Sequence, residues 1–338
     1  MSRIIGAGFG ASVLLLVALS ATQVVARSAE PLVILKFSHV VAPDTPKGKA
    51  AERFASLVKE KTRGRVSVEV YPNSTLYKDN DELEALQLGA VQMLAPSLAK
   101  FAPLGITEFE VFDLPFLFHD QAALRRVEEG PVGTRLFAGL ERRGIKGLAF
   151  WDNGFKVMSA NSPVRTPQDF VGLKMRIQAS KVLDAQFRTL GAKPVVLGLS
   201  EVYGALKAGL VDGTENPPSN LYTQHMNEVQ RYVTVSNHGY LGYAVIVNQM
   251  FWNNLPSDIR AQLEDALREA TTYANAIAQR ENDAALAKVK ATGKTEIYVL
   301  SEEERATWKR ALAPVYVQMQ DRIGKDLIDA IRADANVK

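Results

Sequence analysis

The stretch that decides the fold reads VILKF at residues 33–37, TPKGKAAERFASLVKEKTRG at residues 45–64 and VSVEVY at residues 66–71. The first segment is a short apolar run, which is typical of a buried strand. In the second segment, Thr45 and Pro46 supply a capping residue and a proline at the first position of a helix. The valines of the third segment alternate with polar residues, as in a half-buried strand. This strand–helix–strand order predicts an α/β domain with a largely parallel sheet.

The same alternation continues along the chain. Further strand-like apolar runs follow at residues 91–95, 146–151, 173–177 and 243–247. The segment from Phe109 to Phe118 is dense in aromatic and apolar residues, and we expect it to lie in the core beneath a cleft. Asn153-Gly154 predicts a turn after the second of these runs.

One long helical segment lies near the end of the chain. No proline or glycine occurs between Pro256 and Gly293, and apolar residues recur there near helical spacing. One long helix or two abutting helices are expected, long enough to span two domains. Ser301 and Glu304 then form a capping box that predicts a terminal helix.

The length predicts two domains. A chain of 338 residues exceeds the usual size of a single hydrophobic core. No internal repeat or low-complexity linker separates the domains, so crossing strands are expected to join them. We expect a signal peptide at residues 1–26, a first domain at 27–153 plus 242–281, and a second domain at 154–241 plus 282–338.

The first residues resemble an export signal. Arg3 precedes a nearly uncharged apolar stretch, and Val24-Val25-Ala26 offers small residues for cleavage. An uncleaved membrane anchor is the alternative, but polar residues leave the apolar stretch short for a span. We expect a cleaved signal peptide and a periplasmic protein that starts near Arg27. No cysteine is present to carry a lipid anchor.

Composition disfavours several classes of protein. The net charge is +3 and the charges are interspersed, which gives no case for a nucleic acid or a membrane surface as a partner. The absence of cysteine removes disulfides and thiolate chemistry, and the four histidines show no metal-binding spacing. The sequence contains neither a phosphate-binding glycine loop nor a nucleophile elbow. We therefore expect no catalytic residues, no cofactor and no metal.

Arg176 is the best candidate for binding an anion. It lies in an apolar strand segment, where an arginine without an anionic partner would be costly, and arginine binds carboxylates through paired hydrogen bonds. The same pattern also fits an outward-facing residue on an edge strand. Asn216, in an expected loop, could add amide donors, although it also fits a plain turn residue. Lys156 could supply a second positive charge, and His39 lies at a strand carboxyl end, where ligands of α/β sheets gather; a solvated lysine and a structural histidine are the alternatives.

Six short motifs occur in an order that resembles a known family. They are FSHV at residues 37–40, YPNS at 71–74, APSLAKF at 95–101, FDLPFLF at 112–118, QASKVL at 178–183 and DGTENP at 212–217. Together they resemble the substrate-binding component of TRAP (tripartite ATP-independent periplasmic) transporters, in its dicarboxylate-binding branch. The resemblance covers essentially the whole chain after the signal. It implies a periplasmic-binding-protein-like α/β fold, with two domains, a ligand cleft between them, crossing strands and a long domain-spanning helix.

The resemblance also implies roles for particular residues. The carboxylate-binding arginine of the family falls on Arg176 and its asparagine on Asn216. A cationic position that is arginine in sialic-acid-binding relatives is Lys156 here, and a phenylalanine of those relatives is Leu199, which favours a ligand smaller than sialic acid. The remaining candidate ligand-binding residues are His39 and Lys100, shared with the dicarboxylate branch, Phe155 and Gln178 beside anchor positions, and Ser97 in the third motif.

The sequence thus predicts a monomeric solute-binding protein without enzymatic activity. It is expected to close its domains around a small organic acid, most specifically a four-carbon dicarboxylate such as succinate, malate or fumarate, and to deliver it to the membrane subunits of a TRAP-type permease. Another acid (a 2-oxo acid, a sugar acid or an aromatic acid) and a role as ligand-loaded partner of a sensor are the alternatives. If His39 contacts a carboxylate, its protonation should tighten binding as the pH falls.

Overall fold

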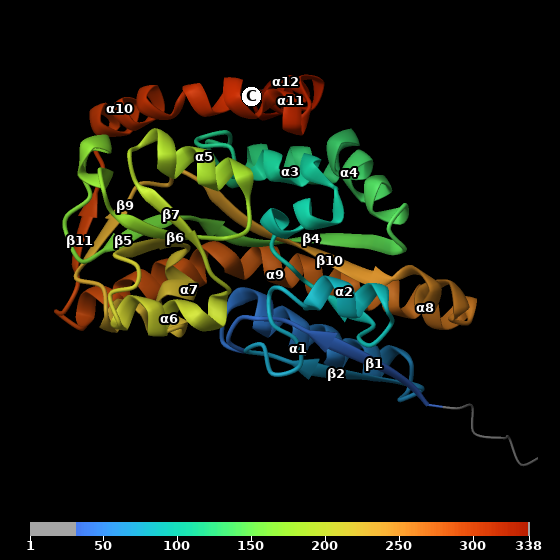
Figure 1. The fold of residues 1–338 in the computed structure, drawn as a ribbon. Helices are drawn as coiled ribbons and strands as arrows, with labels where there is room; N and C mark the ends of the chain where they lie inside the picture. The colour runs from blue at the N-terminus through green and yellow to red at the C-terminus, as the bar shows by residue number, and fades with distance from the viewer. Residues whose placement is uncertain (1–31, 337–338) are drawn as a thin grey trace, which may run out of the picture. The chain divides into compact units, whose positions relative to one another are not determined.

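A computed structural model describes residues 32–336 (Figure 1), so the expected signal peptide lies outside the described residues. The strands are β1 (Val33–Ser38), β2 (Val66–Tyr71), β3 (Met93–Leu94), β4 (Ile145–Phe155), β5 (Val157–Ala160), β6 (Lys174–Ile177), β7 (Lys193–Val196), β8 (Gly213–Asn216), β9 (Tyr232–Val235), β10 (Tyr240–Asn248) and β11 (Glu296–Val299). They form two separate sheets, which we name sheet A and sheet B.

Helices connect these strands. The α-helices are α1 (Pro46–Lys61), α2 (Glu82–Gln87), α3 (Gln121–Glu129), α4 (Pro131–Glu141), α5 (Lys181–Thr189), α6 (Leu199–Lys207), α7 (Pro218–Thr223), α8 (Gln249–Asn254), α9 (Ser257–Ala291), α10 (Glu302–Leu312), α11 (Pro314–Ile323) and α12 (Lys325–Asn336). The 3₁₀ helices are η1 (Leu98–Lys100), η2 (Ala102–Leu104), η3 (Thr107–Asp113), η4 (Pro167–Phe170) and η5 (Met226–Glu228). No helix of the described residues is long and apolar enough to cross a membrane.

Sheet A has the strand order β2-β1-β3-β10-β4. Its first strands confirm the predicted strand–helix–strand unit: β1 and β2 pair in parallel, and α1 connects them. The side chain of Thr45 accepts a hydrogen bond from Gly48 N–H, as a capping residue should, and Pro46 is the first residue of the helix. The long strands β10 and β4 then pair in antiparallel orientation at the other edge.

Sheet B has the strand order β11-β9-β5-β8-β6-β7. Strand β6, which carries Arg176, lies between β7 and β8 and pairs in parallel with both. The Cα atom of Arg176 faces Val195 on one side and Thr214 on the other. Arg176 is therefore on an interior strand of the sheet, and the alternative of an outward-facing edge residue does not apply.

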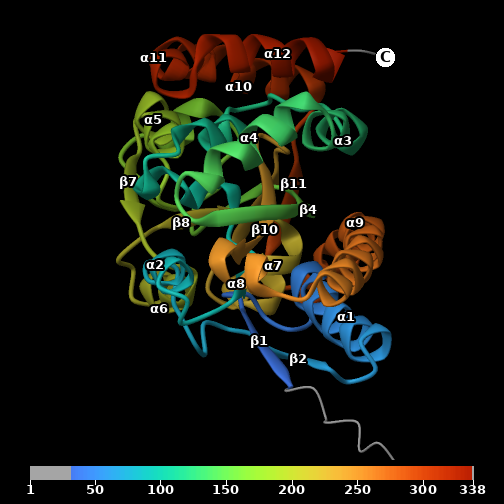
Figure 2. The same ribbon diagram turned by 90° about the vertical axis from the view of Figure 1, so that its right-hand side faces the viewer.

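The chain passes between the sheets three times. Strand β4 ends at Phe155 in sheet A and β5 begins two residues later in sheet B, while β9 returns the chain from sheet B to β10. The N–H of Lys156 donates to Gly239 O at 2.9 Å, which ties these two crossings together. The third connection is α9, whose 35 residues confirm the predicted single long helix and span about 50 Å. It packs against α1 beside sheet A and against α7 beside sheet B (Figure 2).

Three predictions about local structure were wrong. Asn153-Gly154 is not a turn but part of β4, because Gly154 pairs with Leu241 of β10 and the amide of Asn282 on α9 donates to Asn153 O at 2.6 Å. Asn216 ends a strand instead of lying in a loop. The terminal helix is three helices, since Pro314 begins α11 and Gly324 separates it from α12.

Buried apolar side chains fill the space on both faces of each sheet. One cluster lies between sheet A, α1 and α9, and another lies between sheet B and α6. A third extends beneath both sheets and contains Phe109, Phe112 and Leu114, which confirms the predicted core segment. Helices α10 to α12, red in Figure 1, lie over α5, α3 and α4 and contribute buried side chains to this third cluster.

Candidate ligand-binding site

A small cavity lies between the two sheets and takes side chains from both. Its volume is about 20 Å³, which is room for about one water molecule. The sheet A side contributes Val40, Val41, Lys47, Asp79, Ser97, Lys100, Leu241 and Tyr243, and the sheet B side contributes Arg176, Gln178, Leu199, Asn216 and Asn220. Six residues predicted from the sequence line it: Arg176, Asn216, Lys100, Gln178, Leu199 and Ser97.

A larger groove opens beside this cavity. Its volume is about 550 Å³, and it shares Asp79, Lys100, Arg176 and Gln178 with the cavity. The groove is lined by α2 on one side and by the end of β7 on the other. The groove and the cavity therefore share part of their walls.

Arg176 is buried on β6, with a relative exposure of 2%. Its Nε and Nη2 atoms donate to Leu197 O at 2.9 Å and 2.7 Å, and it forms no salt bridge within the described part of the chain. Burial lowers the pKa of Arg176, although Asp79 and Glu215 partly offset this effect. A buried guanidinium with a single carbonyl acceptor has unused donors and a charge that is only partly compensated. An anion in the cavity would supply acceptors for these donors and the missing negative charge.

Asn216 lies on the strand next to Arg176. Its neighbour two positions earlier, Thr214, pairs with Arg176, so β8 and β6 present their side chains to the cavity from adjacent strands. The Nδ2 atom of Asn216 is 3.6 Å from the Sδ atom of Met226. A thioether is a weak acceptor, so the amide can donate to a better acceptor in the cavity.

Two hydrogen bonds cross the cavity between the sheets. Gln178 Nε2 donates to Ser97 Oγ at 2.8 Å, and the backbone N–H of Leu199 donates to Asp79 Oδ2 at 2.8 Å. In each pair one residue comes from the sheet A side and the other from the sheet B side. These residues therefore hold the two halves of the cavity together.

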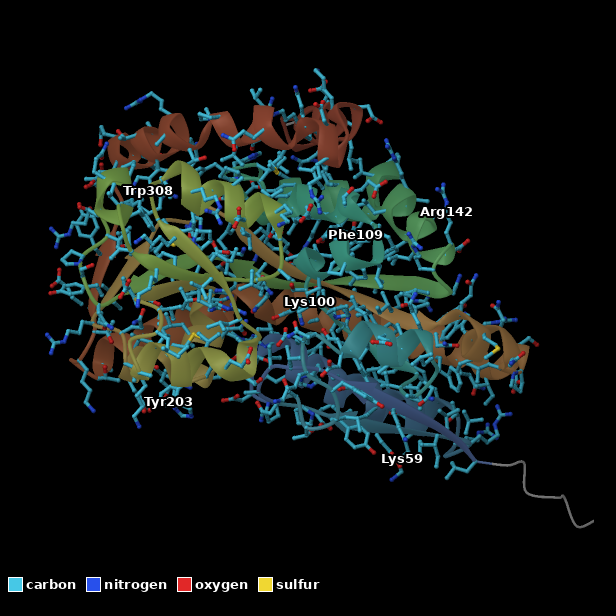
Figure 3. All side chains as sticks on the ribbon, in the orientation of Figure 1. Lys59, Lys100, Phe109, Arg142, Tyr203 and Trp308 are labelled. Carbon is cyan, nitrogen blue, oxygen red and sulfur yellow. The ribbon has the colours of Figure 1, made fainter. Side chains whose placement is uncertain are left out.

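Lys100 lines the cavity, but its charge is already neutralised. Lys100 is buried and lies near the centre of the view in Figure 3, whereas Lys59 is exposed and lies near its lower edge. The Nζ atom of Lys100 is 2.6 Å from a carboxylate oxygen of Glu82 and also forms a salt bridge with Asp79. Burial alone would raise the pKa of Asp79, but the charge and hydrogen bond of Lys100 lower it to about 2. Lys100 and Asp79 thus form an ion pair in the wall of the cavity.

Lys156 does not line the cavity, which differs from its predicted role as a second cation exposed to the ligand. Its Nζ atom is 2.6 Å from Glu215 and 3.6 Å from Asp113, and its side chain is 1% exposed. The second oxygen of Glu215 is 2.8 Å from Nε2 of His238. Lys156 therefore belongs to a buried charge network behind Asn216, in which the carboxylates of Glu215 and Asp113 neutralise its positive charge.

His39 is buried at the end of β1 and is not part of the cavity wall. Burial and the nearby charge of Lys47 lower its pKa to about 3. The expected tightening of binding through protonation of His39 is therefore not supported, because the ring stays neutral over the physiological range. In residues 32–336 no group of three or more histidine, aspartate or glutamate side chains is placed to hold a metal ion.

Phe155 also lies away from the cavity. Its ring packs edge-on against Tyr240 at a centroid distance of 6.1 Å. It lines a different groove, together with Phe116 and Phe118. A role for Phe155 in shaping the cavity would have to be indirect.

Four polar residues of the cavity were not predicted from the sequence: Lys47, Asp79, Asn220 and Tyr243. Lys47 Nζ donates to Ala95 O at 2.9 Å and lies 3.7 Å from the centroid of the Tyr243 ring. One signal was available, since Lys47 is the second residue of α1, and a cation at a helix N-terminus is electrostatically unfavourable. The others carry no signal in the sequence, because only the tertiary structure brings their loops and strands to the cavity.

Comparison with known proteins agrees with this architecture. The sequence profile of the bacterial extracellular solute-binding proteins of family 7 (DctP) matches residues 37–322. The C4-dicarboxylate-binding periplasmic protein DctP of Rhodobacter capsulatus is 62% identical over 331 residues, which cover 98% of each chain. This chain is similar to that protein over nearly its whole length.

Solved structures show the same fold. A TRAP periplasmic solute-binding protein of Sulfurospirillum deleyianum with bound succinate has a TM-score of 0.87 and 45% identity, over 90% of this chain and 99% of that one. One from Pseudomonas aeruginosa with bound L-malate has a TM-score of 0.83 and 45% identity, over 85% and 99% of the two chains. The fold is thus the two-domain α/β fold of TRAP periplasmic binding proteins, and the chain belongs to the DctP family of bacterial extracellular solute-binding proteins.

Proposed function

We propose that this protein captures a four-carbon dicarboxylate such as succinate, malate or fumarate and delivers it to a TRAP-type membrane permease. The single observation that carries the proposal is that two cations lining the cavity, Lys47 and Arg176, form no salt bridge with any described residue. The third cation of the lining, Lys100, is already paired with Asp79 and Glu82. Two unpaired cations match the two carboxylates of a dianion.

The size of the cavity supports a mechanism of domain closure. A space for about one water molecule cannot admit a diacid unless the two sheets separate or side chains move. Opening breaks the Gln178–Ser97 and Leu199–Asp79 hydrogen bonds, and the ligand supplies the contacts that favour reclosure. Closure also removes water, which strengthens each charged contact.

Each predicted site residue receives a role in this proposal. Arg176 binds one carboxylate through paired hydrogen bonds, and Asn216 donates to the same group. Gln178, Ser97 and Leu199 close the cavity around the ligand, and Lys100 fixes Asp79 in its wall. Three residues act from outside the wall: Lys156 by holding Glu215 behind Asn216, and His39 and Phe155 by packing.

The cellular context is part of the proposal. We propose that residues 1–26 are a cleaved export signal, that the mature protein is a periplasmic monomer, and that its partners are the permease subunits and not nucleic acid. The two domains would comprise residues 27–153 plus 242–281 and residues 154–241 plus 282–338. The protein would carry out no catalysis, since its cavity serves to hold and release an unchanged solute.

Ligand-induced stabilisation tests the function. Succinate, malate and fumarate should each raise the melting temperature, because a ligand that binds only the folded state stabilises it by RT ln(1 + [L]/Kd). Butyrate, which has the same chain length and one carboxylate, and galactonate, a sugar acid, are the comparison ligands. A shift with galactonate alone, or with none of the diacids, would contradict the proposed ligand.

A further inference from the structure

Four lysine and arginine side chains are buried in the described part of the chain: Lys47, Lys100, Lys156 and Arg176. Two of them are neutralised by carboxylates, because Lys100 pairs with Asp79 and Glu82, and Lys156 pairs with Glu215 and Asp113. The other two, Lys47 and Arg176, form no salt bridge with any described residue. Both of these unpaired cations line the same cavity.

The surroundings of Lys47 leave part of its ammonium group unused. The group has three N–H donors, and one of them is directed to Ala95 O at 2.9 Å. The face of the Tyr243 ring lies 3.7 Å away and adds a cation–π contact. Neither partner carries a negative charge, and Glu82 and Asp79 favour the ammonium without forming a salt bridge with it, so the cost of burying the ammonium is only partly compensated within the protein.

The position of Lys47 in the helix adds to this cost. Lys47 follows Pro46 in the first turn of α1, where the helix dipole disfavours a positive charge. Burial and the nearby charge of Lys100 lower the pKa of Lys47 to about 7, which agrees with an ammonium that has no anionic partner in the unligated protein. Both effects would be relieved by an anion in the cavity.

The two unpaired cations also come from opposite sides of the cavity. Lys47 belongs to α1 beside sheet A, and Arg176 belongs to β6 in sheet B. A dianion that binds both would join the two halves, whereas a monoanion would satisfy one and leave the other unpaired. This arrangement makes closure depend on a second carboxylate.

We infer that Lys47 is the residue that binds the second carboxylate of the ligand, opposite Arg176, and that it thereby makes the site selective for diacids over monoacids. This inference rests on the proposed function. It assigns to Lys47 the role that the sequence analysis gave to Lys156. Lys47 is therefore a specificity-determining residue of the site.

The test compares succinate with butyrate in the full mature chain. Lys47→Met keeps the length of the side chain and removes its charge, and Lys47→Gln removes the charge but keeps a hydrogen-bond donor. Lys49→Met, two residues further along α1 and outside the cavity, is the matched control. Dissociation constants are measured by calorimetry for succinate and by displacement for butyrate, after melting curves establish that each variant is folded.

Wild type and Lys49→Met should bind succinate far more tightly than butyrate. Lys47→Met should weaken succinate binding at least about 30-fold, as expected when one member of a buried charge pair is removed, and should leave butyrate binding nearly unchanged. Lys47→Gln should also lose the preference for succinate over butyrate. If the methionine variant does not fold, the glutamine variant provides the test. The inference would be overturned if a folded Lys47 variant kept its preference for succinate, or if it lost the same factor in affinity for both acids. If the wild-type protein bound no diacid, the proposed function would be overturned, and the inference with it.

Discussion

The Oδ2 atom of Asp79 accepts a hydrogen bond from the backbone N–H of Leu199 at 2.8 Å, and so joins the loop before α2 to the first residue of α6. The partners belong to opposite sides of the cavity. The pKa of Asp79, about 2, keeps the carboxylate ionised at any physiological pH. This single bond therefore links the two sides of the cavity, and its acceptor adds a negative charge to the cavity wall.

Substitution of Asp79 separates these two contributions. Asp79→Asn removes the charge and keeps an oxygen that can accept from Leu199, whereas Asp79→Ala removes both. The dissociation rate of succinate should be about fivefold faster in the alanine variant than in the asparagine variant, since one hydrogen bond contributes about 1 kcal/mol. Stopped-flow displacement measures both rates, and equal rates would show that the bond to Leu199 does not hold the closed form.

Arg176→Lys tests the paired hydrogen bonds of the guanidinium. The charge is kept and the planar pair of donors is lost, so the dissociation constant for succinate should rise at least about tenfold, or 1.4 kcal/mol. Arg188→Lys, on the exposed side of α5, is the control and should bind as wild type does. Calorimetry measures the dissociation constant of each variant, and an unchanged affinity of Arg176→Lys for succinate would contradict binding through paired hydrogen bonds.

The affinity for fumarate should fall as the pH rises above about 7. In the unligated protein the pKa of Lys47 is about 7, and a carboxylate beside the ammonium raises it in the complex. Binding then takes up a proton above pH 7, so the affinity is constant at lower pH and decreases by at most tenfold per pH unit above it. Fumarate is the suitable ligand because both of its carboxyl groups stay ionised over this range.

The groups that face Lys47 include His39, Asp79, Lys100 and Tyr243, with Glu82 behind Lys100. The pKa of His39 is about 3 and that of Tyr243 about 12, so neither titrates between pH 6 and 9. Burial raises the pKa of Glu82, and the variant Lys47→Met separates its titration from that of Lys47. A pH profile that is the same in Lys47→Met and in wild type would assign the effect to another group.

Lys156→Met should destabilise the protein. Its removal leaves Asp113 without its cation and Glu215 with His238 as its remaining partner, and breaking a buried pair in this way costs roughly 3–5 kcal/mol. Burial raises the pKa of Asp113 to about 6 even with Lys156 present. The loss should therefore be larger at pH 8 than at pH 5, where Asp113 takes up a proton.

Urea unfolding at the two pH values measures this effect. Lys59→Met, on the exposed face of α1, is the control and should change the free energy of unfolding by less than about 0.5 kcal/mol. A folded Lys156→Met protein of wild-type stability that had lost succinate binding would restore the direct ligand role that the sequence analysis expected.

Local patterns account for the parts of the fold that were predicted correctly. The strand–helix–strand unit at residues 33–71 and the long helix α9 follow from apolar periodicity and from capping residues, which act over a few positions. The Asn153-Gly154 turn was predicted wrongly because contacts with distant parts of the chain decide the structure there. Pairing with β10 and a hydrogen bond from Asn282 on α9 override the local preference, and both partners are far away in the sequence.

The sequence by itself determined the family fold and singled out Arg176 as a candidate anion-binding residue, because an arginine within an apolar strand is visible as a local pattern. Only the tertiary structure decided which second cation is available to a ligand. Lys156 is neutralised by Glu215, 59 positions away, and by Asp113, while Lys47 meets a carbonyl and an aromatic ring. The charge of a lysine is fixed by its residue type, but its pairing depends on groups that folding brings within a few ångströms.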